Sequence, residues 1–373
     1  MVNPPNQHIV TTTNLISKMK ERPVYPFEPL GLALAIGRVD PDTGLPGIPL
    51  GKIMEFSGRA GTCKSATADQ VVLGVQKKDP EAICLGLFFE EFDDDRFQSL
   101  NLDTDRYWAM DWFSNDKNMT LRSAEMGLKT MIQIIKDEPK VKCCVIDSLG
   151  AMAVSKEMYT DKGEEKEFDA YIQYGARAKV TTEFINHYMR IPVTRRPILI
   201  MINHSKDKID ANAGGPPKNV IIDESSKRKT PCGTGKDFRT DVRLECHSRK
   251  HYLDDGKTLN NQGLKIQDGW EVIHEVFRNR GTCEDADRRP QSIFLLDEHR
   301  FDVEEEIIKY AKGLNLIYST GNWIEIEGTK YNGVVKAKEA LRNFPELKLS
   351  LIKKLAPLAH KIFGETKKVS NDI

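Results

Sequence analysis

The chain has 373 residues, and its 55 Lys and Arg balance 55 Asp and Glu, so the formal net charge is zero. This balance excludes a uniformly basic nucleic-acid coat and an acidic solvating tail, and any affinity for DNA must come from local patches. Apolar residues at 39%, seven cysteines without a CxxC pair, no signal peptide and no apolar stretch long enough to span a membrane predict a cytoplasmic globular protein without membrane contact.

The N-terminal segment, residues 1–48, is predicted to be a mixed leader. It has a short helical candidate at 14–20, and a turn-rich loop around 40–47. Between them, Pro23, Pro26 and Pro29 disfavour a helix. We therefore expect no helix in this proline-rich stretch.

Strands alternate with helices from residue 49 to about residue 300. The predicted strands of this core are 53–58, 82–89, 141–146 and 197–203, and the predicted helices are 64–77, 121–137 and 169–189. Several strands are wholly apolar, which is typical of a parallel sheet covered on both faces. We expect an α/β fold with a mostly parallel central sheet, which the strands 242–246, 270–278 and 292–296 extend in antiparallel fashion.

The remaining residues, 301–373, are predicted to form a small α-rich C-terminal domain. Its expected helices are 303–312, 335–343 and 347–363. Residues 330–373 hold ten basic and four acidic residues, an excess of +6 that favours attraction of duplex DNA through counterion release. A solvated helical face is the alternative interpretation.

A phosphate-binding loop is predicted between the strand 53–58 and the helix 64–77. The spacing is that of GxxxxGK[ST], which aims backbone N–H groups at phosphate oxygens at the start of a helix. In this pattern Lys64 neutralises the β and γ phosphates and the Ser65 hydroxyl ligates Mg²⁺. A chance Gly-rich turn is the alternative. The predicted nucleotide-binding residues of the loop are Gly58, Arg59, Ala60, Gly61, Thr62, Cys63, Lys64, Ser65 and Ala66.

Cys63 stands where the pattern has its second glycine. If this position needs a positive φ, a residue with a side chain costs about 1–2 kcal/mol there.

Two carboxylates end other predicted strands of the core. Asp147 follows the strand 141–146, where it can hold Mg²⁺ through the water shell. Glu90 follows the strand 82–89, where a carboxylate can orient and deprotonate an attacking water. Each feature alone has an ordinary structural explanation, but their order on alternating β/α units predicts a P-loop NTPase core that uses Mg²⁺.

From about residue 28 to residue 365 the chain resembles a divergent RecA-family recombinase. The resemblance rests on an ordered series of segments: 46–58, 89–94, 145–148, 200–204, 233–245, 277–280 and 322–328. It implies a RecA-like core, a leader used in polymerisation, and helical filaments that hold ATP between neighbouring subunits.

The resemblance also implies roles for five residues around the nucleotide. Asp94 and Phe97 would lie against the adenine, and His204 would sense the γ-phosphate where bacterial members usually carry Gln. Arg278 and Arg280 match a paired-cation motif that reaches the ATP of the neighbouring subunit, where they would act as catalytic arginines.

Two DNA-binding loops are implied at about 155–171 and 205–237. Lys206 and Lys208 would hold phosphates, while Ile209 would wedge between bases. The second loop has seven basic and five acidic residues, so charge alone does not establish DNA binding, and a solvated loop is the alternative. The residues implied to bind DNA are Met158, Arg177, Lys206, Lys208, Ile209, Gly233 and Thr234, and Phe238 is implied to couple subunits.

We therefore expect an ATP-dependent recombinase that forms filaments on single-stranded DNA, pairs it with homologous double-stranded DNA and exchanges strands in recombination and repair. One alternative is a hexameric RecA-fold DNA helicase. Another is a DNA-coating filament protein whose ATP hydrolysis is impaired by Cys63. The degree of divergence suits a bacteriophage-encoded protein acting in the host cytoplasm.

Overall fold

The structure is a computed structural model that describes residues 12–90, 94–110, 123–160, 175–205, 230–252, 267–280 and 288–363. Within these residues the helices are α1 (Thr12–Lys20), α2 (Leu30–Ile36), α3 (Lys64–Lys78), α4 (Asp94–Ser99), α5 (Ala124–Asp137), α6 (Ser155–Met158), α7 (Ala176–Met189), α9 (Val303–Gly313), α10 (Gly333–Asn343), α11 (Pro345–Leu355) and α12 (Ala359–Ile362). The strands are β1 (Val24–Pro26), β2 (Arg38–Val39), β3 (Pro46–Pro49), β4 (Ile53–Gly58), β5 (Ile83–Phe88), β6 (Tyr107–Ala109), β7 (Val141–Asp147), β8 (Ile198–Ile202), β9 (Val242–Tyr252), β10 (Gln267–Asn279), β11 (Gln291–Leu295), β12 (Arg300–Phe301), β13 (Tyr318–Thr320), β14 (Trp323–Ile326) and β15 (Thr329–Asn332).

A nine-stranded sheet forms the centre of the molecule, in the order β12-β11-β10-β9-β4-β8-β7-β5-β6. From β9 to β6 every neighbouring pair is parallel, whereas β9, β10, β11 and β12 pair antiparallel. This arrangement confirms the predicted α/β fold with a mostly parallel sheet and an antiparallel extension. β9 reaches Tyr252, beyond the predicted end, because β10 pairs with it along its whole length.

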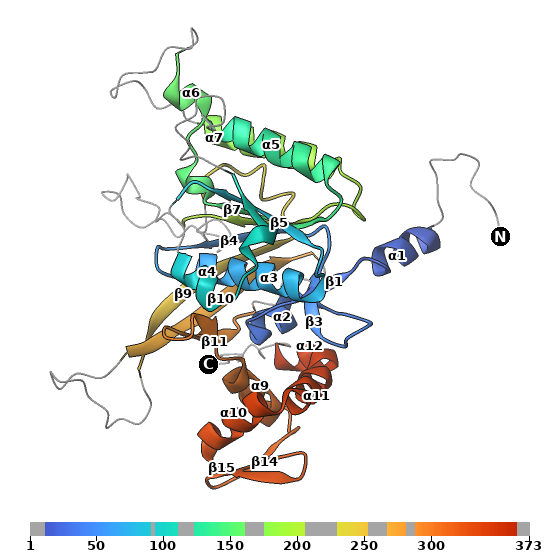
Figure 1. Ribbon diagram of the computed structural model, residues 1–373, viewed down its shortest axis with the longest axis vertical. Coiled ribbons are helices and arrows are strands. Elements are labelled where there is room, and N and C mark those ends of the chain that lie inside the picture. The colour runs from blue at the N-terminus through green and yellow to red at the C-terminus, as the bar shows by residue number, and fades with distance from the viewer. Residues whose placement is uncertain are drawn as a thin grey trace, which may run out of the picture.

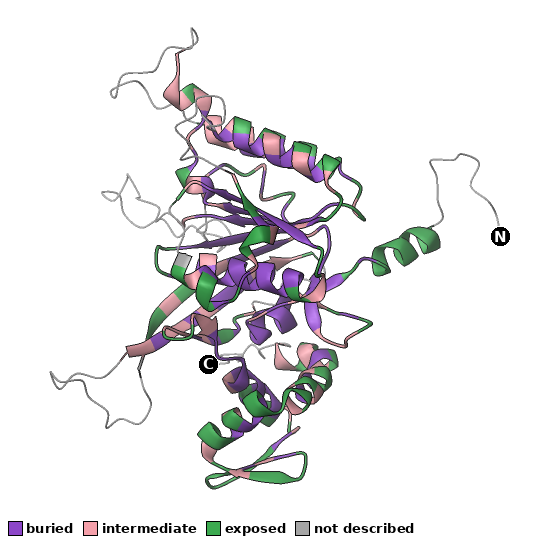
Figure 2. Cartoon of the chain, in the orientation of Figure 1, coloured by how far each residue is buried: buried purple, intermediate pink, exposed green. Residues whose placement is uncertain are grey.

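Helices cover both faces of the parallel strands (Figure 1). In β8, Ile198, Ile200 and Ile202 join one hydrophobic cluster with residues of α3, while Leu199 and Met201 join a second cluster with residues of α5 and α7. Because side chains alternate along a strand, an apolar strand such as β8 can fill both clusters at once. Figure 2 shows these strands as buried between the two helical layers.

The leader contains regular structure on both sides of its prolines. β1, β3 and β2 form a small antiparallel sheet, and all seven residues of α2 are buried. Pro29 precedes the helix, where its fixed φ does no harm, and the run after it is apolar on every side, as a fully buried helix requires. The carboxyl group of the buried Glu306 accepts hydrogen bonds from the N–H groups of Leu30 at 2.6 Å and Gly31 at 3.3 Å, so it caps the start of α2.

α1 differs from the rest of the leader. None of its residues is buried, and it projects from the body of the molecule (Figures 1 and 2). Leu15 and Ile16 are each 49% exposed and Met19 is 37% exposed. The helix therefore presents an apolar stripe to solvent.

The C-terminal region packs as a small α-rich unit at one end of the molecule (Figure 1). Its apolar residues share a cluster with Leu30 and Leu34 of α2. The predicted helix over 347–363 is divided into α11 and α12 around Pro357, and the sheet β13-β14-β15 was not predicted. Among the described residues no helix is both long and apolar enough to cross a membrane.

Candidate nucleotide-binding site

The predicted phosphate loop lies between the end of β4 and the start of α3, as the sequence indicates. Three of its residues have positive φ: Gly58 at 149°, Gly61 at 72° and Cys63 at 59°. A Cβ on Gly58 would meet the Cys246 carbonyl oxygen at 2.5 Å, so only glycine fits that position. The loop therefore has the tight path that directs backbone N–H groups toward an anion.

Cys63 has a left-handed conformation directly before α3, with φ 59° and ψ 24°. The position of the second glycine therefore does have a positive φ, and the side chain of Cys63 costs about 1–2 kcal/mol there relative to an unstrained residue. Burial raises the pKa of the Cys63 thiol to about 12, so the side chain is neutral beside the loop.

Lys64 is almost fully buried at the first position of α3. Its Nζ donates to the Arg59 carbonyl oxygen at 2.6 Å, which holds the ammonium across the loop. Burial lowers the pKa of Lys64, against the opposing effect of acidic groups that include Asp147 and Glu90. Lys64 is therefore a buried cation on the phosphate loop, near acidic groups, and this position suits contact with phosphate groups.

Ser65 and Asp147, the two expected Mg²⁺ ligands, lie in direct contact. The Ser65 hydroxyl donates to Asp147 Oδ2 at 2.6 Å. Burial raises the pKa of Asp147, although the hydrogen bond from Ser65 counteracts the effect. Ser65 and Asp147 thus present a hydroxyl oxygen and a carboxylate oxygen side by side. Burial disfavours the negative charge of the carboxylate, and such a pair of oxygen ligands suits a small divalent cation.

Glu90 lies next to this pair, beyond the end of β5. Its Oε1 accepts a hydrogen bond from the Ser148 hydroxyl and lies 3.0 Å from His204 Nε2. Burial opposes ionisation, but the contacts with Ser148 and His204 outweigh it and lower the pKa of Glu90. The structure therefore presents an ionised carboxylate that can orient a water. Ser148 was missed as a partner of Glu90; its position directly after Asp147 was the available signal.

Phe97, which is expected to lie against the adenine, packs into an aromatic cluster of the core. Phe97 is 7% exposed, and its ring packs with Tyr107 at 5.5 Å and Phe88 at 6.3 Å between centroids. The three aromatic rings thus pack against one another, and Phe97 offers almost no exposed surface to a base. Asp94 begins α4, but its side chain lies outside what the structure describes.

Arg278 and Arg280 at the end of β10 contact the main chain of the segment before β9. Arg278 donates to the Asp237 carbonyl oxygen and Arg280 to the Phe238 carbonyl oxygen. Phe238 itself is 70% exposed. The two arginines therefore hold the turn that carries this exposed aromatic side chain.

The residues expected to bind DNA are only partly described. Met158 ends α6 and is half-buried, and Gly233 and Thr234 are exposed in the turn that lies against α7. Arg177 is occupied within the chain, because its Nε lies 2.9 and 3.0 Å from the Glu157 carboxylate oxygens. Lys206, Lys208 and Ile209 lie outside the described residues, as do 161–171 of the first loop.

The charge of the C-terminal region is largely paired within the described structure. Three of its cations contact acidic residues of 298–305: Lys338, Arg342 and Lys348. Lys354 contacts Glu327 at 2.6 Å. The sequence excess of +6 therefore overstates the charge free to attract duplex DNA.

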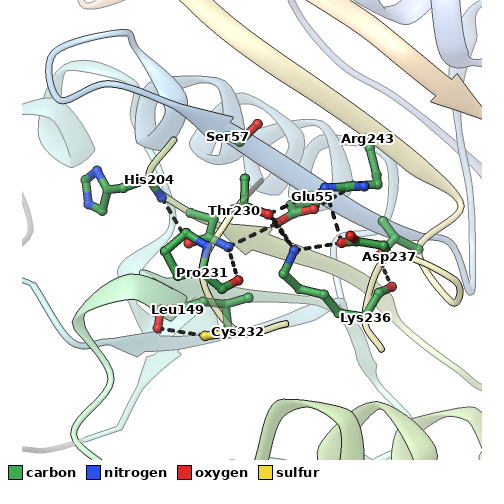
Figure 3. Close-up of polar contacts among 12 residues, drawn as sticks. Glu55, Ser57, Leu149, His204, Thr230, Pro231, Cys232, Lys236, Asp237 and Arg243 are labelled. Carbon is green, nitrogen blue, oxygen red and sulfur yellow. Dashed lines mark hydrogen bonds and ion pairs between the residues drawn. The ribbon is translucent and has the colours of Figure 1, made fainter. Parts of the chain in front are cut away.

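Lys236 also departs from expectation. It was counted among the basic residues of the second loop, but its side chain is 0% exposed and lies 2.6 Å from the Glu55 carboxylate (Figure 3). Sequence reasoning missed Glu55 altogether, since a charged residue inside an apolar strand was its only signal.

Comparison with known proteins places this site in context. The protein RecA of Ureaplasma parvum serovar 3 is 22% identical over 307 residues, which cover 82% of this chain and 78% of the relative. The protein RecA of Bacteroides thetaiotaomicron is 24% identical over 82% of this chain and 80% of the relative, and that of Nitratiruptor sp. is 23% identical over 88% and 84%. No protein-family model matches the chain. The chain is thus distantly related to RecA proteins, and its α/β core is RecA-like.

Proposed function

We propose that this chain is an ATP-dependent DNA recombinase that polymerises on single-stranded DNA, pairs it with homologous duplex and exchanges strands. The observation that carries the proposal is the meeting of Lys64, the Ser65–Asp147 pair and the Glu90–His204 pair at one end of the parallel strands. The distant relationship to RecA proteins supports the same activity.

The chemistry follows from the contacts of these side chains. Ser65 and Asp147 would hold Mg²⁺, which supplies charge neutralisation between the phosphates. Lys64 adds a positive charge on the phosphate loop. Glu90, kept ionised by its hydrogen bonds, orients the attacking water and accepts its proton. His204 is positioned by Glu90 to respond to the terminal phosphate.

A filament is the assembly that the exposed features favour. The apolar stripe of α1 has no cover within the described residues of its own chain and suits a neighbouring copy. Arg278, Arg280 and the exposed Phe238 lie on another edge, where they would reach the ATP and the surface of the next subunit. This activity belongs in the cytoplasm, that of the host if the chain is phage-encoded.

A DNA-coating filament protein with impaired hydrolysis is the second candidate. The observation that favours it is the left-handed conformation of Cys63, which strains the loop that must hold the phosphates. Under this candidate the purified protein binds single-stranded DNA with ATP but turns over slowly.

The test is ATP hydrolysis with and without single-stranded DNA, together with a D-loop assay. A recombinase gives DNA-stimulated turnover and D-loops, and electron microscopy shows open helical filaments rather than the closed rings of a helicase. Lys64→Ala should abolish nucleotide binding, whereas Glu90→Gln should keep binding and lose about 10²–10⁴-fold in turnover. Normal turnover in both variants would refute the site as assigned.

Duplex binding by the C-terminal region is proposed for the cations outside the ion pairs described above. Lys353→Ala combined with Lys361→Ala should weaken binding of double-stranded DNA and lower its salt dependence. Lys348→Ala is the matched control, because Lys348 already lies 2.7 Å from Glu304 and should affect stability instead.

A further inference from the structure

Three metal-ligating side chains meet between β9 and β10: Glu245 and His247 of β9 and Glu275 of β10. One carboxylate oxygen of each glutamate and one ring nitrogen of the histidine all lie within 4.8 Å of one another. The closest printed pair is His247 Nε2 and Glu275 Oε2, which are 3.1 Å apart. Two strands of the sheet therefore bring a nitrogen donor and two oxygen donors to one point.

The antiparallel pairing of β9 with β10 explains why these side chains share one face of the sheet (Figure 1). Glu245 and Glu275 are directly opposite each other in the register, and His247 follows two residues after Glu245. Side chains alternate along a strand, so Glu245 and His247 point to the same face. The opposite face of β9 carries Leu244 and Cys246, which belong to the hydrophobic cluster beside α3. The three donors therefore lie on the face of β9 that turns away from this cluster.

The charges of this group favour a cation. Two carboxylates directly opposite each other on neighbouring strands repel, and this arrangement destabilises a sheet. Glu275 is only 6% exposed, so water stabilises its charge poorly. Arg289 Nη2 lies 2.7 Å from Glu275 Oε1 and engages that oxygen, which leaves Oε2 beside His247. A divalent ion among the three side chains would remove the repulsion between the two glutamates.

The spacing of the donor atoms suits a tetrahedral metal ion. Nitrogen and oxygen ligands lie about 2.0–2.2 Å from Zn²⁺, so two ligand atoms on one tetrahedral ion are roughly 3.3–3.6 Å apart. The 3.1 Å between His247 Nε2 and Glu275 Oε2 is close to this separation. The limit of 4.8 Å for the whole group leaves a short distance that side-chain rotation can close. Three protein ligands then leave the fourth position of the ion to water.

The donor types select the class of metal. An imidazole nitrogen suits Zn²⁺ and its neighbours in the first transition row, whereas Mg²⁺ and Ca²⁺ prefer oxygen ligands alone. Ser65 and Asp147 of the nucleotide site offer oxygen only. The two sites therefore favour different ions, and Mg²⁺ at the nucleotide site does not compete for the site on β9 and β10.

The group also lies where β9 borders the phosphate loop. Glu245 is level with Ser57, near the end of β4, in the parallel pairing of these two strands. The hydroxyl of Ser248, directly after His247, donates to the Gly61 carbonyl oxygen at 3.0 Å. An ion held between β9 and β10 would therefore stiffen the strand that contacts the phosphate loop.

We propose that Glu245, His247 and Glu275 bind one divalent transition-metal ion, with Zn²⁺ as the best match, at a site separate from that of the nucleotide. Arg289 holds the Glu275 carboxylate in place, and the ion links β9 to β10 through side chains. An ion that binds only the folded chain stabilises it, and the stabilisation grows with the concentration of the ion. The alternative is a row of ion pairs from His247 through Glu275 to Arg289 that holds no metal.

The experiment titrates Zn²⁺ into the full chain without nucleotide, at about pH 8, because a histidine has to be neutral to ligate a metal. Excess Mg²⁺ is present throughout to occupy sites that offer oxygen alone. Isothermal titration calorimetry gives the number of ions bound and their affinity, and Co²⁺ in place of Zn²⁺ reports the geometry of the ligands through its visible absorption. The melting temperature with and without Zn²⁺ measures the stabilisation.

The test variants are His247→Ala and Glu245→Gln, whose side chains are not buried, so both variants should fold. The matched control is His251→Ala, because His251 lies on the same strand and its Nδ1 is 2.7 Å from an Asp268 carboxylate oxygen. We expect the wild type and the control to bind the ion equally and to gain the same rise in melting temperature. Each test variant should bind it at least about tenfold more weakly, since losing even a group that only orients a ligand costs about 10–100-fold.

Three results would overturn the proposal. If the wild type binds no Zn²⁺, or if His247→Ala binds it as tightly as the wild type does, the three side chains form ion pairs only. If Glu245→Gln keeps the wild-type affinity, the site does not have the three ligands assigned to it. If the control loses the ion as well, the metal is bound elsewhere on the strand. None of these measurements uses ATP hydrolysis or DNA, so the proposal stands or falls independently of the proposed function.

Discussion

Replacing Cys63 tests whether the phosphate loop stores backbone strain. The left-handed conformation of this residue costs about 1–2 kcal/mol for any residue with a Cβ, whereas glycine adopts it freely. Glycine in turn loses about 0.5–1 kcal/mol through its greater freedom in the unfolded chain. Cys63→Gly and Cys63→Ala both remove the sulfur and its packing, so the difference between them isolates the backbone effect. We expect Cys63→Gly to be more stable than Cys63→Ala by roughly 0.5–1 kcal/mol.

The assay is urea unfolding of both variants under identical conditions, with the slopes compared to confirm that the same surface is exposed. A difference of about 1 kcal/mol corresponds to roughly a fivefold change in the unfolding equilibrium constant. Equal stability of the two variants, or greater stability of Cys63→Ala, would refute the strain argument. A large rise in ATP turnover in Cys63→Gly would add that the strain impairs hydrolysis, as the DNA-coating candidate requires.

Three further predictions concern pH and assembly. Burial lowers the pKa of His274 from 6.5 to about 3, so the unfolded chain binds a proton at a higher pH than the folded protein does, and the free energy of unfolding falls as the pH drops from 6.5 to 3. His274→Gln should reduce this loss of stability, as measured by urea unfolding at several pH values. An unchanged loss of stability on acidification would contradict the burial of His274. Burial raises the pKa of Glu306 from 4.5 to about 8, so the folded state keeps a proton that the unfolded state releases, and the free energy of unfolding falls as the pH rises from 4.5 to 8. The stability of Glu306→Gln relative to the wild type should therefore increase as the pH rises through this range. A stability difference that does not change with pH would argue against a protonated carboxyl group. The double variant Leu15→Asp/Ile16→Asp on α1 should reduce the mass of the assembly measured by light scattering. It should not lower the melting temperature, because both side chains are half exposed. An unaltered mass would exclude α1 from assembly.

The sequence predicted the parts of the site that follow from local pattern. The strand-turn-helix of the phosphate loop, with Lys64 and Ser65 at its end, depends on spacing within one segment. Asp147 and Glu90 could be predicted from the sequence because the carboxyl ends of parallel strands meet at one edge of the sheet. The contact of Ser65 with Asp147 agrees with the expectation that both residues ligate one Mg²⁺ ion.

The features that were missed depend on tertiary packing. Glu55 looks like an isolated charge in an apolar strand, and its partner Lys236 is 181 residues away in a segment whose composition indicates a loop. Phe97 matches an adenine-binding pattern, but neighbouring aromatic residues enclose it. α2 follows three prolines that argue against a helix, and its contacts with two separate hydrophobic clusters and the cap from Glu306 stabilise it.

The burial of α2 decides where the chain can be cut. Leu32 and Ile36 belong to the hydrophobic cluster beside α3, while Leu30 and Leu34 belong to that of the C-terminal unit, so this helix joins both. A truncated chain that starts after residue 48 would expose both cores to water. Arg22, whose guanidinium donates to the Leu50 carbonyl oxygen at 2.9 Å, anchors the backbone that follows α1. A shortened protein that begins at Glu21 would keep this anchor and both cores while losing residues 1–20, which include the projecting helix.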